Sequence, residues 1–458
     1  MGLRIGVLLF GTVILIFLLP FQPPVLPEFL LPMKKNFLIV AAFLLFGSQA
    51  FSGGFQVALQ GQRQIGMAHT GTALAFDASS VFFNPGSLAF TIKNNVSLGG
   101  SLIRSRVKYI AWQETDAPSN YQSETESPLG TPFALYASYG LKDSRFKFGL
   151  GVYTPYGSSV KWPSDWKGYS VLRSLKLQSV FIQPTVSFRL SDKIGIGAGF
   201  VYATGGVELQ KGIGALALQN GFSEAGLKGS ADGLGYNIGI HAKLSEDLSF
   251  GLDYRSKVDM KVKDGEATFI VPPSTSGVLG LFPPGGKTSF SATLPLPATL
   301  SAGLAWKAGP KLLLALDYNL VYWSAYKELR FEYGASVNGA MSTASPRNYK
   351  DASIIRFGAE YQASQKFAVR AGYYFDQTPV SDGYMTPETP DANRNCFTAG
   401  LGYHVSDKLS VDASFLYVEG KTREQSPSDI PANAPDSFVP GTYKIRVFVP
   451  GISLSYNF

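Results

Sequence analysis

The feature that most constrains this chain is a repeated alternation of apolar residues with small or polar ones. At the carboxyl end Ile452, Leu454 and Tyr456 alternate with glycine and serine, and Phe458 is the last residue. A period of two gives a strand one apolar face and one polar face. Beyond the first fifty residues, no run approaches the ~20 consecutive apolar residues of a membrane-spanning helix. We therefore expect a large all-β protein.

The composition is poor in charge and rich in glycine and aromatic residues. Soluble globular chains carry about 25% charged residues, whereas only 16% of these 458 residues are charged, with 49 glycines and 13% aromatic residues. The single cysteine, Cys396, excludes an intramolecular disulfide and a cysteine-cluster metal site. The net charge of +7 is too small to indicate a nucleic-acid partner. We expect no metal and no other cofactor.

Residues 1–52 are expected to form a leader. A signal peptide over about 33–52 is indicated by Met33-Lys34-Lys35, the apolar run 37–46 and the small residues that follow. Residues 1–32 contain a second apolar stretch. Either translation starts at Met33 and residues 1–32 are a mis-assigned extension, which we favour, or the chain keeps an N-terminal anchor.

Counting the turns predicts fourteen strands. The short polar turns lie near Asp143, Asp192, 246–247, 309–310, 364–365 and 406–407, and the longer stretches between them are 113–128, 157–169, 211–230, 264–297, 333–350, 377–394 and 425–442. Six short turns and seven long loops make thirteen connections. Short turns at one end and long loops at the other are typical of outer-membrane barrels, whose short turns face the periplasm. We therefore expect an antiparallel, 14-stranded transmembrane β-barrel over residues 95–458, in the outer membrane of a Gram-negative-type bacterium, with both termini periplasmic.

Aromatic residues gather near the predicted strand ends. They are Tyr153, Tyr156, Trp306, Tyr322, Trp323 and Tyr326. Because tyrosine and tryptophan rings are enriched at membrane–water boundaries, we expect these side chains to mark the edges of the lipid layer. Packing in an ordinary protein core is the alternative.

Residues 53–94 precede the first strand and show no clean alternation. A fourteen-stranded barrel has a lumen wider than an eight-stranded one, which its own side chains fill, so a segment of this length could plug it. The stretches 53–56, 66–71 and 77–85, which include Gly53, Phe55, Asn84 and Pro85, resemble the N-terminal hatch of the FadL/TodX family. That family comprises outer-membrane transporters of long-chain fatty acids and other hydrophobic compounds.

The resemblance continues along the mature chain. Residues 148–157 resemble the family's third strand, and residues 371–380, running on to Asp391, resemble its eleventh strand and the following loop. Gly86 is a departure, because the family usually has alanine after Asn-Pro.

The resemblance implies passive transport without catalysis. A hydrophobic ligand is captured among the long loops, enters a pocket inside the barrel and leaves sideways when the hatch moves and a kink in the third strand opens the wall. The kink would lie at Pro155, Tyr156 and Gly157. Pro155 removes a ladder donor and Gly157 removes a side chain, so the strand is expected to bend there. Alternatively, these residues only end the strand at the rim.

A fatty acid would need a cation for its carboxylate, because an unpaired buried charge is costly. The resemblance places Lys211 at such a position, with Arg347 and Lys350 near a second one. Each could equally be a solvated loop cation, and if Lys211 points to solvent a neutral hydrocarbon or aromatic ligand fits as well. For the capture groove we single out apolar residues of two long loops. They are Leu216, Leu218, Leu279, Leu281 and Phe282.

Two other functions remain open. A porin for small solutes would share the barrel, and an outer-membrane lipid hydrolase would need a serine–histidine pair. His69, His241 and His404 lie far apart in sequence, and no Gly-x-Ser-x-Gly or His-Glu-x-x-His motif occurs. Besides a hydrophobic ligand, the expected partners are outer-membrane lipid, lipopolysaccharide and the barrel assembly machinery, which would read the strand ending in Phe458. We expect a monomer.

Overall fold

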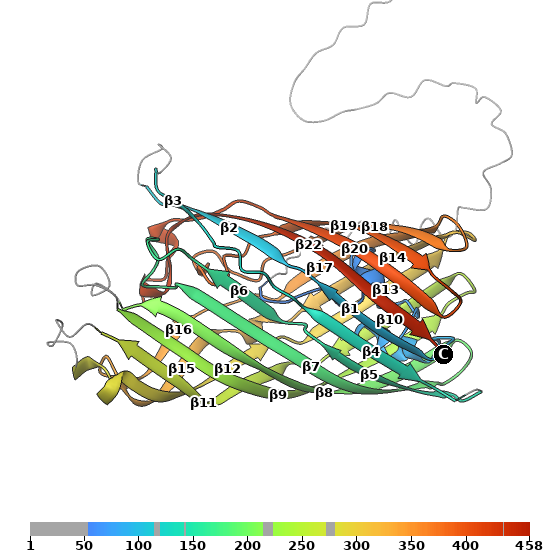
Figure 1. Ribbon diagram of the computed structural model, residues 1–458, viewed down its shortest axis with the longest axis horizontal. Helices are drawn as coiled ribbons and strands as arrows, with labels where there is room; N and C mark the ends of the chain where they lie inside the picture. Colours follow the sequence, from blue (N-terminus) through green and yellow to red (C-terminus); the bar gives the residue numbers. More distant parts are fainter. Residues whose placement is uncertain (1–53, 114–119, 142, 214–222, 272–279, 434) are drawn as a thin grey trace, which may run out of the picture. The chain divides into compact units, whose positions relative to one another are not determined.

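The computed structural model describes residues 54–113, 120–141, 143–213, 223–271, 280–433 and 435–458. One antiparallel sheet closes on itself, because β1 (Asn95–Ser101) pairs with β22 (Gly441–Asn457). Closure satisfies the edges that fourteen open strands would leave unpaired. The barrel and the segment inside it belong to one compact unit (Figure 1).

The fourteen barrel strands are confirmed, although eight of them are interrupted. In order around the barrel they are β1 with β2 (Arg104–Ala111), β3 (Gln122–Glu124) with β4 (Phe133–Tyr139), β5 (Phe146–Tyr153) with β6 (Gly157–Lys161), β7 (Ser174–Arg189), β8 (Ile194–Gly212), β9 (Glu224–Lys243), β10 (Leu248–Arg255) with β11 (Val258–Ile270), β12 (Lys287–Leu296) with β13 (Thr299–Lys307), β14 (Leu312–Val321) with β15 (Glu328–Val337), β16 (Ala340–Pro346) with β17 (Ala352–Gln362), β18 (Phe367–Asp376), β19 (Arg394–His404), β20 (Leu409–Gly420) with β21 (Arg423–Gln425), and β22.

All six predicted short turns lie between consecutive strands at one end of the barrel. The predicted loop 333–350 is wrong, because β15 and β16 pair up to Val337 and Ala340 and leave only Asn338 and Gly339 between them. Both turn residues have positive φ, 51° and 79°, as a two-residue hairpin requires. The predicted loops 157–169, 211–230 and 264–297 are also shorter, because strand pairing continues into them.

The alternation marks two faces of the wall. On β22, Ile452 and Leu454 are 60% and 52% exposed, whereas Ser453 and Ser455 are 6% and 7% exposed. The apolar face therefore points outward, where it can contact lipid, and the small polar face points into the lumen. Among the described residues, no helix is long and apolar enough to cross a membrane.

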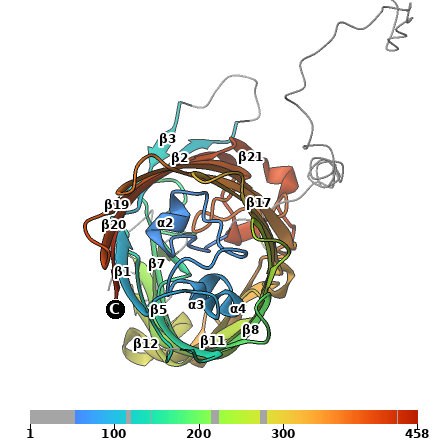
Figure 2. The ribbon, with the colours of Figure 1, turned by 90° about the vertical axis from the view of Figure 1, so that its right-hand side faces the viewer.

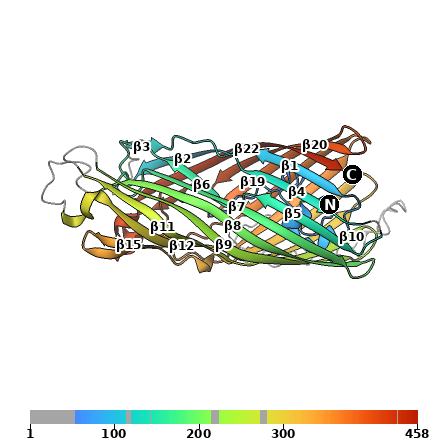
Figure 3. The ribbon, with the colours of Figure 1, turned by 60° about the horizontal axis from the view of Figure 1, so that its bottom comes forward.

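The strands β7, β8 and β9 are much longer than a bilayer crossing, as their tilted ribbons show (Figure 3). Strand β9 has 20 residues, against the ~9–11 that suffice to span the lipid. On its long-loop half, Lys228 forms an exposed ion pair with Glu208 at 3.0 Å. On its other half, Ile238 is an exposed apolar side chain. We therefore expect the long-loop half of the barrel to stand in water, beyond the lipid belt.

Residues 54–94, which we call the hatch, lie inside the barrel (Figure 2). The hatch contains the short helices α2 (Gln62–Ile65), α3 (Ser80–Phe83) and α4 (Pro85–Leu88). Asn84 precedes α4, and its side chain accepts a hydrogen bond from the Gly86 amide and donates to the Ile240 carbonyl of the wall. A Cβ on Gly86 would lie 2.8 Å from the carbonyl oxygens of both Gly195 and Gly239. Glycine at this position therefore lets α4 approach the wall closely.

The predicted rim position is wrong for most of the aromatic residues. Tyr153, Tyr156, Trp323 and Tyr326 are buried inside the barrel, whereas Trp306 is 41% exposed. The first four pack against hatch residues or against each other, so the interior and not the bilayer boundary selects them.

Candidate functional site

An apolar pocket, which we call the chamber, lies among the long-loop halves of the strands. Its lining residues are Phe55, Tyr156, Ser158, Leu175, Leu177, Gln178, Ser179, Gly206, Val207, Leu209, Ala231, Met260, Val262, Ala292, Thr293, Leu294, Leu296, Tyr326, Leu329, Phe331, Glu388 and Thr389. Pockets lined mainly by apolar side chains are typical sites for small hydrophobic ligands.

The chamber is apolar because the lumen-facing residues of single strands are apolar near the long loops and become polar farther along. On β7 the lumen-facing residues near the long loops are Leu175 and Leu177, and those farther along are Gln183, Thr185 and Ser187. The first pair lines the chamber, and the polar residues face the hatch. No sequence-based expectation included these leucines, although apolar residues on the otherwise polar face of a strand are a signal that locates them.

The hatch contributes Phe55 to the chamber lining. Its ring centroid lies 4.9 Å from that of Trp323 and 5.8 Å from that of Tyr326, both in edge-to-face contact. Before it, the Gly54 amide donates to the Asp391 carboxylate at 2.9 Å. Phe55 is 6% exposed, so aromatic contacts from the wall hold the start of the described hatch against the chamber.

A second cavity, of about 620 Å³, has the opposite character. The charged groups that line it are Asp253, Arg255, Asp317 and Arg356. Hatch residues 56–58 also line it, and Tyr156 lines both cavities. The hatch segment 55–58 therefore separates an apolar compartment from a charged one.

The third barrel strand is interrupted next to this segment. Strand β5 pairs with β4 and β7, but β6 pairs with β7 alone among the strands that the structure describes. Between them, the Pro155 carbonyl accepts a hydrogen bond from the Val57 amide at 2.8 Å, and the Gly157 amide donates to the Phe55 carbonyl at 3.1 Å. Thr154 still donates to the Phe133 carbonyl of the second barrel strand, but from Pro155 to Gly157 these backbone bonds go inward to the hatch.

The remainder of the hatch is held by buried charges. Arg63 binds both carboxylate oxygens of Glu360, at 2.9 and 2.6 Å. Glu360 also accepts from Arg370 at 2.6 Å, and Arg370 donates to Asp412 at 2.6 Å. Bidentate, charge-assisted bonds are the strong ones, so this chain of four residues fixes α2 against β17, β18 and β20.

His69 joins the hatch segment that follows α2 to the segment that precedes it. Its Nε2 accepts a hydrogen bond from the Gln60 amide at 3.2 Å. Burial holds the pKa of His69 well below its usual value, and the nearby charge of Arg356 lowers it further. The ring is therefore neutral at physiological pH, as its acceptor role requires.

The structure separates the three cations that the sequence analysis singled out for a carboxylate. Lys350, before β17, is exposed, and neither it nor Lys211, near the end of β8, lines the chamber. Lys211 also has an exposed side chain, but it lies close enough to Glu388 for the two charges to interact. Arg347 is buried, but its Nη2 donates to the Glu388 carboxylate at 2.5 Å. Glu388 lines the chamber and was missed by the sequence analysis, which had no pattern to show that its loop turns inward.

The predicted groove and hatch residues fall partly outside the described ranges. Gly53, Leu216, Leu218 and Leu279 are not described. Of the other two groove residues, Leu281 is exposed and Phe282 stacks on Phe269 with ring centroids 5.2 Å apart.

A serine–histidine contact does exist in the hatch. Ser87 Oγ and His241 Nδ1 lie 2.9 Å apart. Both are buried where α4 meets β9, and in the described part of the chain no carboxylate hydrogen-bonds to His241. The contact holds α4 against the wall.

Together these features define a class of protein: a plugged membrane β-barrel with an apolar chamber beside an interruption in its wall. The model of the family described as outer membrane protein transport protein (OMPP1/FadL/TodX) matches residues 43–458. The chain belongs to this family, and it is an outer-membrane transport protein.

Relatives and solved structures agree with this assignment. A long-chain fatty acid transport protein of Escherichia coli O6:H1 is 26% identical over 84% of this chain and 90% of its own length. Outer membrane protein P1 of Haemophilus influenzae is 24% identical, over 85% and 91%. A crystal structure of a Pseudomonas aeruginosa FadL homologue superposes with a TM-score of 0.75 at 21% identity, covering 89% of this chain and 100% of that one. For the Pseudomonas putida toluene transporter TodX the TM-score is 0.66 at 16% identity, over 90% and 99%.

Proposed function

We propose that this protein transports long-chain fatty acids or similar hydrophobic molecules passively across the outer membrane. Extracellular loops capture the ligand, the chamber holds it, and movement of hatch residues 55–58 releases it sideways at the interruption in the third strand. The observation that carries the proposal is the double role of Phe55. Its ring lines the chamber, and its carbonyl bonds to the backbone at Gly157.

The charged cavity supports a sideways exit. A hydrophobic ligand that continued along the lumen would have to displace water from two arginines and two aspartates, which is costly for an apolar molecule. The wall beside residues 155–157 offers lipid instead. Residues Leu281 and Phe282 are candidates for the capture groove, together with Leu216, Leu218 and Leu279.

Further parts of the account are also proposals. Residues 1–52 form a removable leader, residues 53–94 the hatch domain and residues 95–458 the barrel domain. The short turns and both termini face the periplasm, so that the long-loop half meets lipopolysaccharide. The barrel assembly machinery recognises the last strand, β22, and the mature protein is a monomer without catalytic activity.

The experiment uses two adjacent residues of β7 that point to opposite faces. Leu177→Asp places a charge in the chamber, whereas Lys176→Asp changes an exposed outward residue. We expect Leu177→Asp to reduce uptake of a labelled fatty acid or alkanol into cells about tenfold or more, because the charge must be desolvated beside the ligand. Lys176→Asp should transport normally, and both should show the heat-modifiable mobility of a folded barrel. Normal uptake by folded Leu177→Asp protein would rule out the chamber as the route.

A further inference from the structure

Among the described residues that line the chamber, one is ionisable apart from the tyrosines, and that residue is an acid. Among the described residues that line it, Glu388 is the only carboxylate, and no lysine, arginine or histidine is present. A ligand carboxylate would therefore meet no cation among the described lining residues. Two cations lie near Glu388 outside that lining: Arg347, which pairs with it, and Lys211, whose charge interacts with it.

The Arg347–Glu388 pair is buried and well satisfied. The two side chains are 3% and 12% exposed. Arg347 Nη1 also donates to Ser345 Oγ at 2.6 Å. Separating such a pair leaves a charge buried without a partner, which is strongly destabilising. A fatty acid that paired with Arg347 would leave the Glu388 carboxylate buried without a partner.

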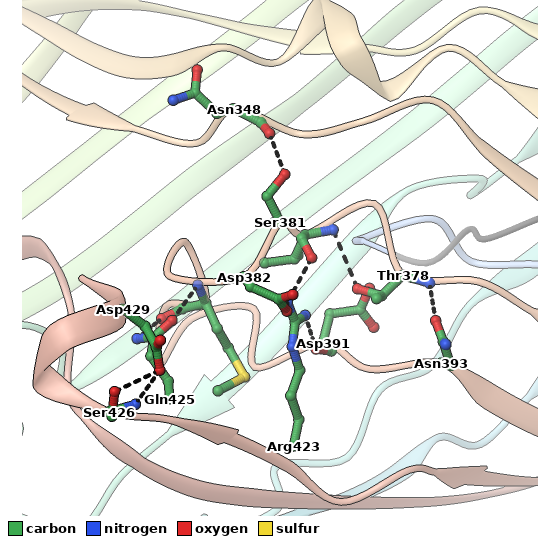
Figure 4. A network of polar contacts seen from close by, with 12 residues as sticks. Asn348, Thr378, Ser381, Asp382, Asp391, Asn393, Arg423, Gln425, Ser426 and Asp429 are labelled. Carbon is green, nitrogen blue, oxygen red and sulfur yellow. Dashed lines mark hydrogen bonds and ion pairs between the residues drawn. The ribbon is translucent and has the colours of Figure 1, made fainter. Parts of the chain in front are cut away.

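The loop that carries Glu388 is held by polar contacts of residues on both sides of Glu388 (Figure 4). Arg423 donates to the carbonyls of Val380 and Asp391 and to the Asp382 carboxylate. Thr378 donates to the Asp391 carboxylate at 2.7 Å, which also accepts from the hatch at Gly54.

A second set of bonds holds the tip of the same loop. Gln425 accepts from the Met385 amide and donates to the Met385 carbonyl, and Ser381 Oγ donates to the Asn348 carbonyl. These contacts join the loop to β21 and to the segment before β17. Glu388 therefore has a prearranged position at the chamber wall.

We infer that Glu388 is a specificity-determining residue that makes the chamber select neutral hydrophobic ligands over ionised carboxylates. By pairing with Arg347 it neutralises that cation, and its own charge repels a second carboxylate. Within the described residues, Arg347 provides the sole hydrogen bond to the Glu388 carboxylate, through Oε1. Oε2 can therefore accept from the hydroxyl of a neutral amphiphile such as a long-chain alcohol. This inference rests on the proposed function, because it assumes that the chamber holds the transported ligand.

The test compares a saturated fatty acid with the primary alcohol of the same chain length, at pH 8, where the acid is ionised. Equilibrium binding is measured with radiolabelled ligands on proteoliposomes. We expect the unmodified protein to bind the alcohol about tenfold or more tightly than the acid, because one charge-assisted hydrogen bond is missing for the acid. This comparison requires no variant, so it does not depend on whether a mutant folds.

The variants assign the effect to one residue. Glu388→Gln frees Arg347 and should tighten acid binding about tenfold or more. Alcohol binding should weaken severalfold, because glutamine keeps an acceptor for the hydroxyl but not its charge. The double change Arg347→Gln/Glu388→Gln removes both charges and should return acid binding to the level of the unmodified protein. If acid binding tightens in Glu388→Gln but not in the double variant, Arg347 is the cation that Glu388 neutralises.

Three outcomes would overturn the inference. Equal or tighter binding of the acid by the unmodified protein would mean that the carboxylate displaces Glu388 or finds another cation. If folded Glu388→Gln protein still binds the acid as weakly as the unmodified protein does, a group other than Glu388 distinguishes the acid from the alcohol. If neither ligand binds to the unmodified protein, the chamber is not a ligand site and the proposed function fails as well.

Discussion

At the scale of residues, glycines of the barrel wall determine how closely the hatch can pack against it. An ideal Cβ on Gly251 of β10 would lie 1.9 Å from the carbonyl oxygen of Thr72. On the other side, Asp317 accepts hydrogen bonds from the amides of Gly71 and Thr72 and from the Thr72 hydroxyl, at 2.8, 3.0 and 2.8 Å. The hatch at Thr72 is therefore held between a carboxylate and a position where no side chain fits.

We expect Gly251→Val to weaken seating of the hatch by about 1–3 kcal/mol, the usual cost of overpacking. The unmodified protein should be nearly silent in single-channel conductance, whereas Gly251→Val should show frequent openings. Gly100→Ala is the control, because the nearest atom to its new Cβ, the Pro132 carbonyl oxygen, lies at 3.5 Å. A steady, high conductance of the unmodified protein would instead favour a porin.

His69 gives the seated hatch a dependence on pH. Its pKa is lowered in the folded protein, mainly by burial, whereas a free ring protonates near pH ~6.5. The contribution of neutral His69 is therefore complete above that pH and is lost as the pH falls from there toward the lowered pKa. The other charged groups around the same cavity are Asp253, Arg255, Asp317 and Arg356.

We expect amide hydrogen exchange in residues 54–60 to accelerate below pH 6.5, by up to about tenfold per pH unit after correction for the intrinsic rate. His69→Gln, which keeps an acceptor but does not titrate, should remove this dependence between pH 5 and 7. If the variant keeps the same pH profile, the titrating group is one of the carboxylates and not His69.

At the scale of elements, the alternation and the turn residues predicted the barrel well. The outward Ile452 and Leu454, the inward Ser453 and Ser455, and all six short turns followed from local patterns. The strand interruptions did not, because they depend on contacts between segments far apart in sequence. Tyr156 is an example of such a contact, because its backbone forms an isolated bridge with Gln56, one hundred residues earlier.

The candidate site was less predictable than the fold. Phe55 and residues 155–157 were singled out from a resemblance, and the structure brings them into contact. Glu388 could not be found, because its loop position has no period and its partner, Arg347, lies 41 residues away. The charge on Arg347 was noticed, but only three-dimensional packing shows that it is already neutralised.

The two halves of β9 should differ in their access to water. Lys228→Cys lies on the long-loop half and Ile238→Cys in the apolar belt, and both side chains point outward. We expect a membrane-impermeant maleimide to label Lys228→Cys on intact cells and to leave Ile238→Cys unlabelled, because lipid covers the second position. Native Cys396 is buried and should not react. Equal labelling of both positions would contradict the assigned level of the membrane.

At the scale of the whole molecule, the barrel places two unlike compartments in series. The apolar chamber lies among the long loops, the charged cavity lies beyond it, and hatch residues 55–58 lie between them. The same residues bond to the interrupted third strand. One movement of this segment would therefore open the chamber and free the wall at the same place.

The measurement that tests this account most directly is ligand uptake with the hatch locked to the wall. An ideal Cβ on Gly157 would lie 3.9 Å from Val57 Cγ2, so side chains at these two positions are in contact and cysteines there can be tested for cross-linking. We expect cells carrying oxidised Val57→Cys/Gly157→Cys protein to take up labelled ligand at less than about a tenth of the normal rate. Ligand binding should be unchanged, reductant should restore uptake, and each single cysteine variant should behave normally. Uptake at the normal rate by the fully cross-linked protein would contradict release through this opening.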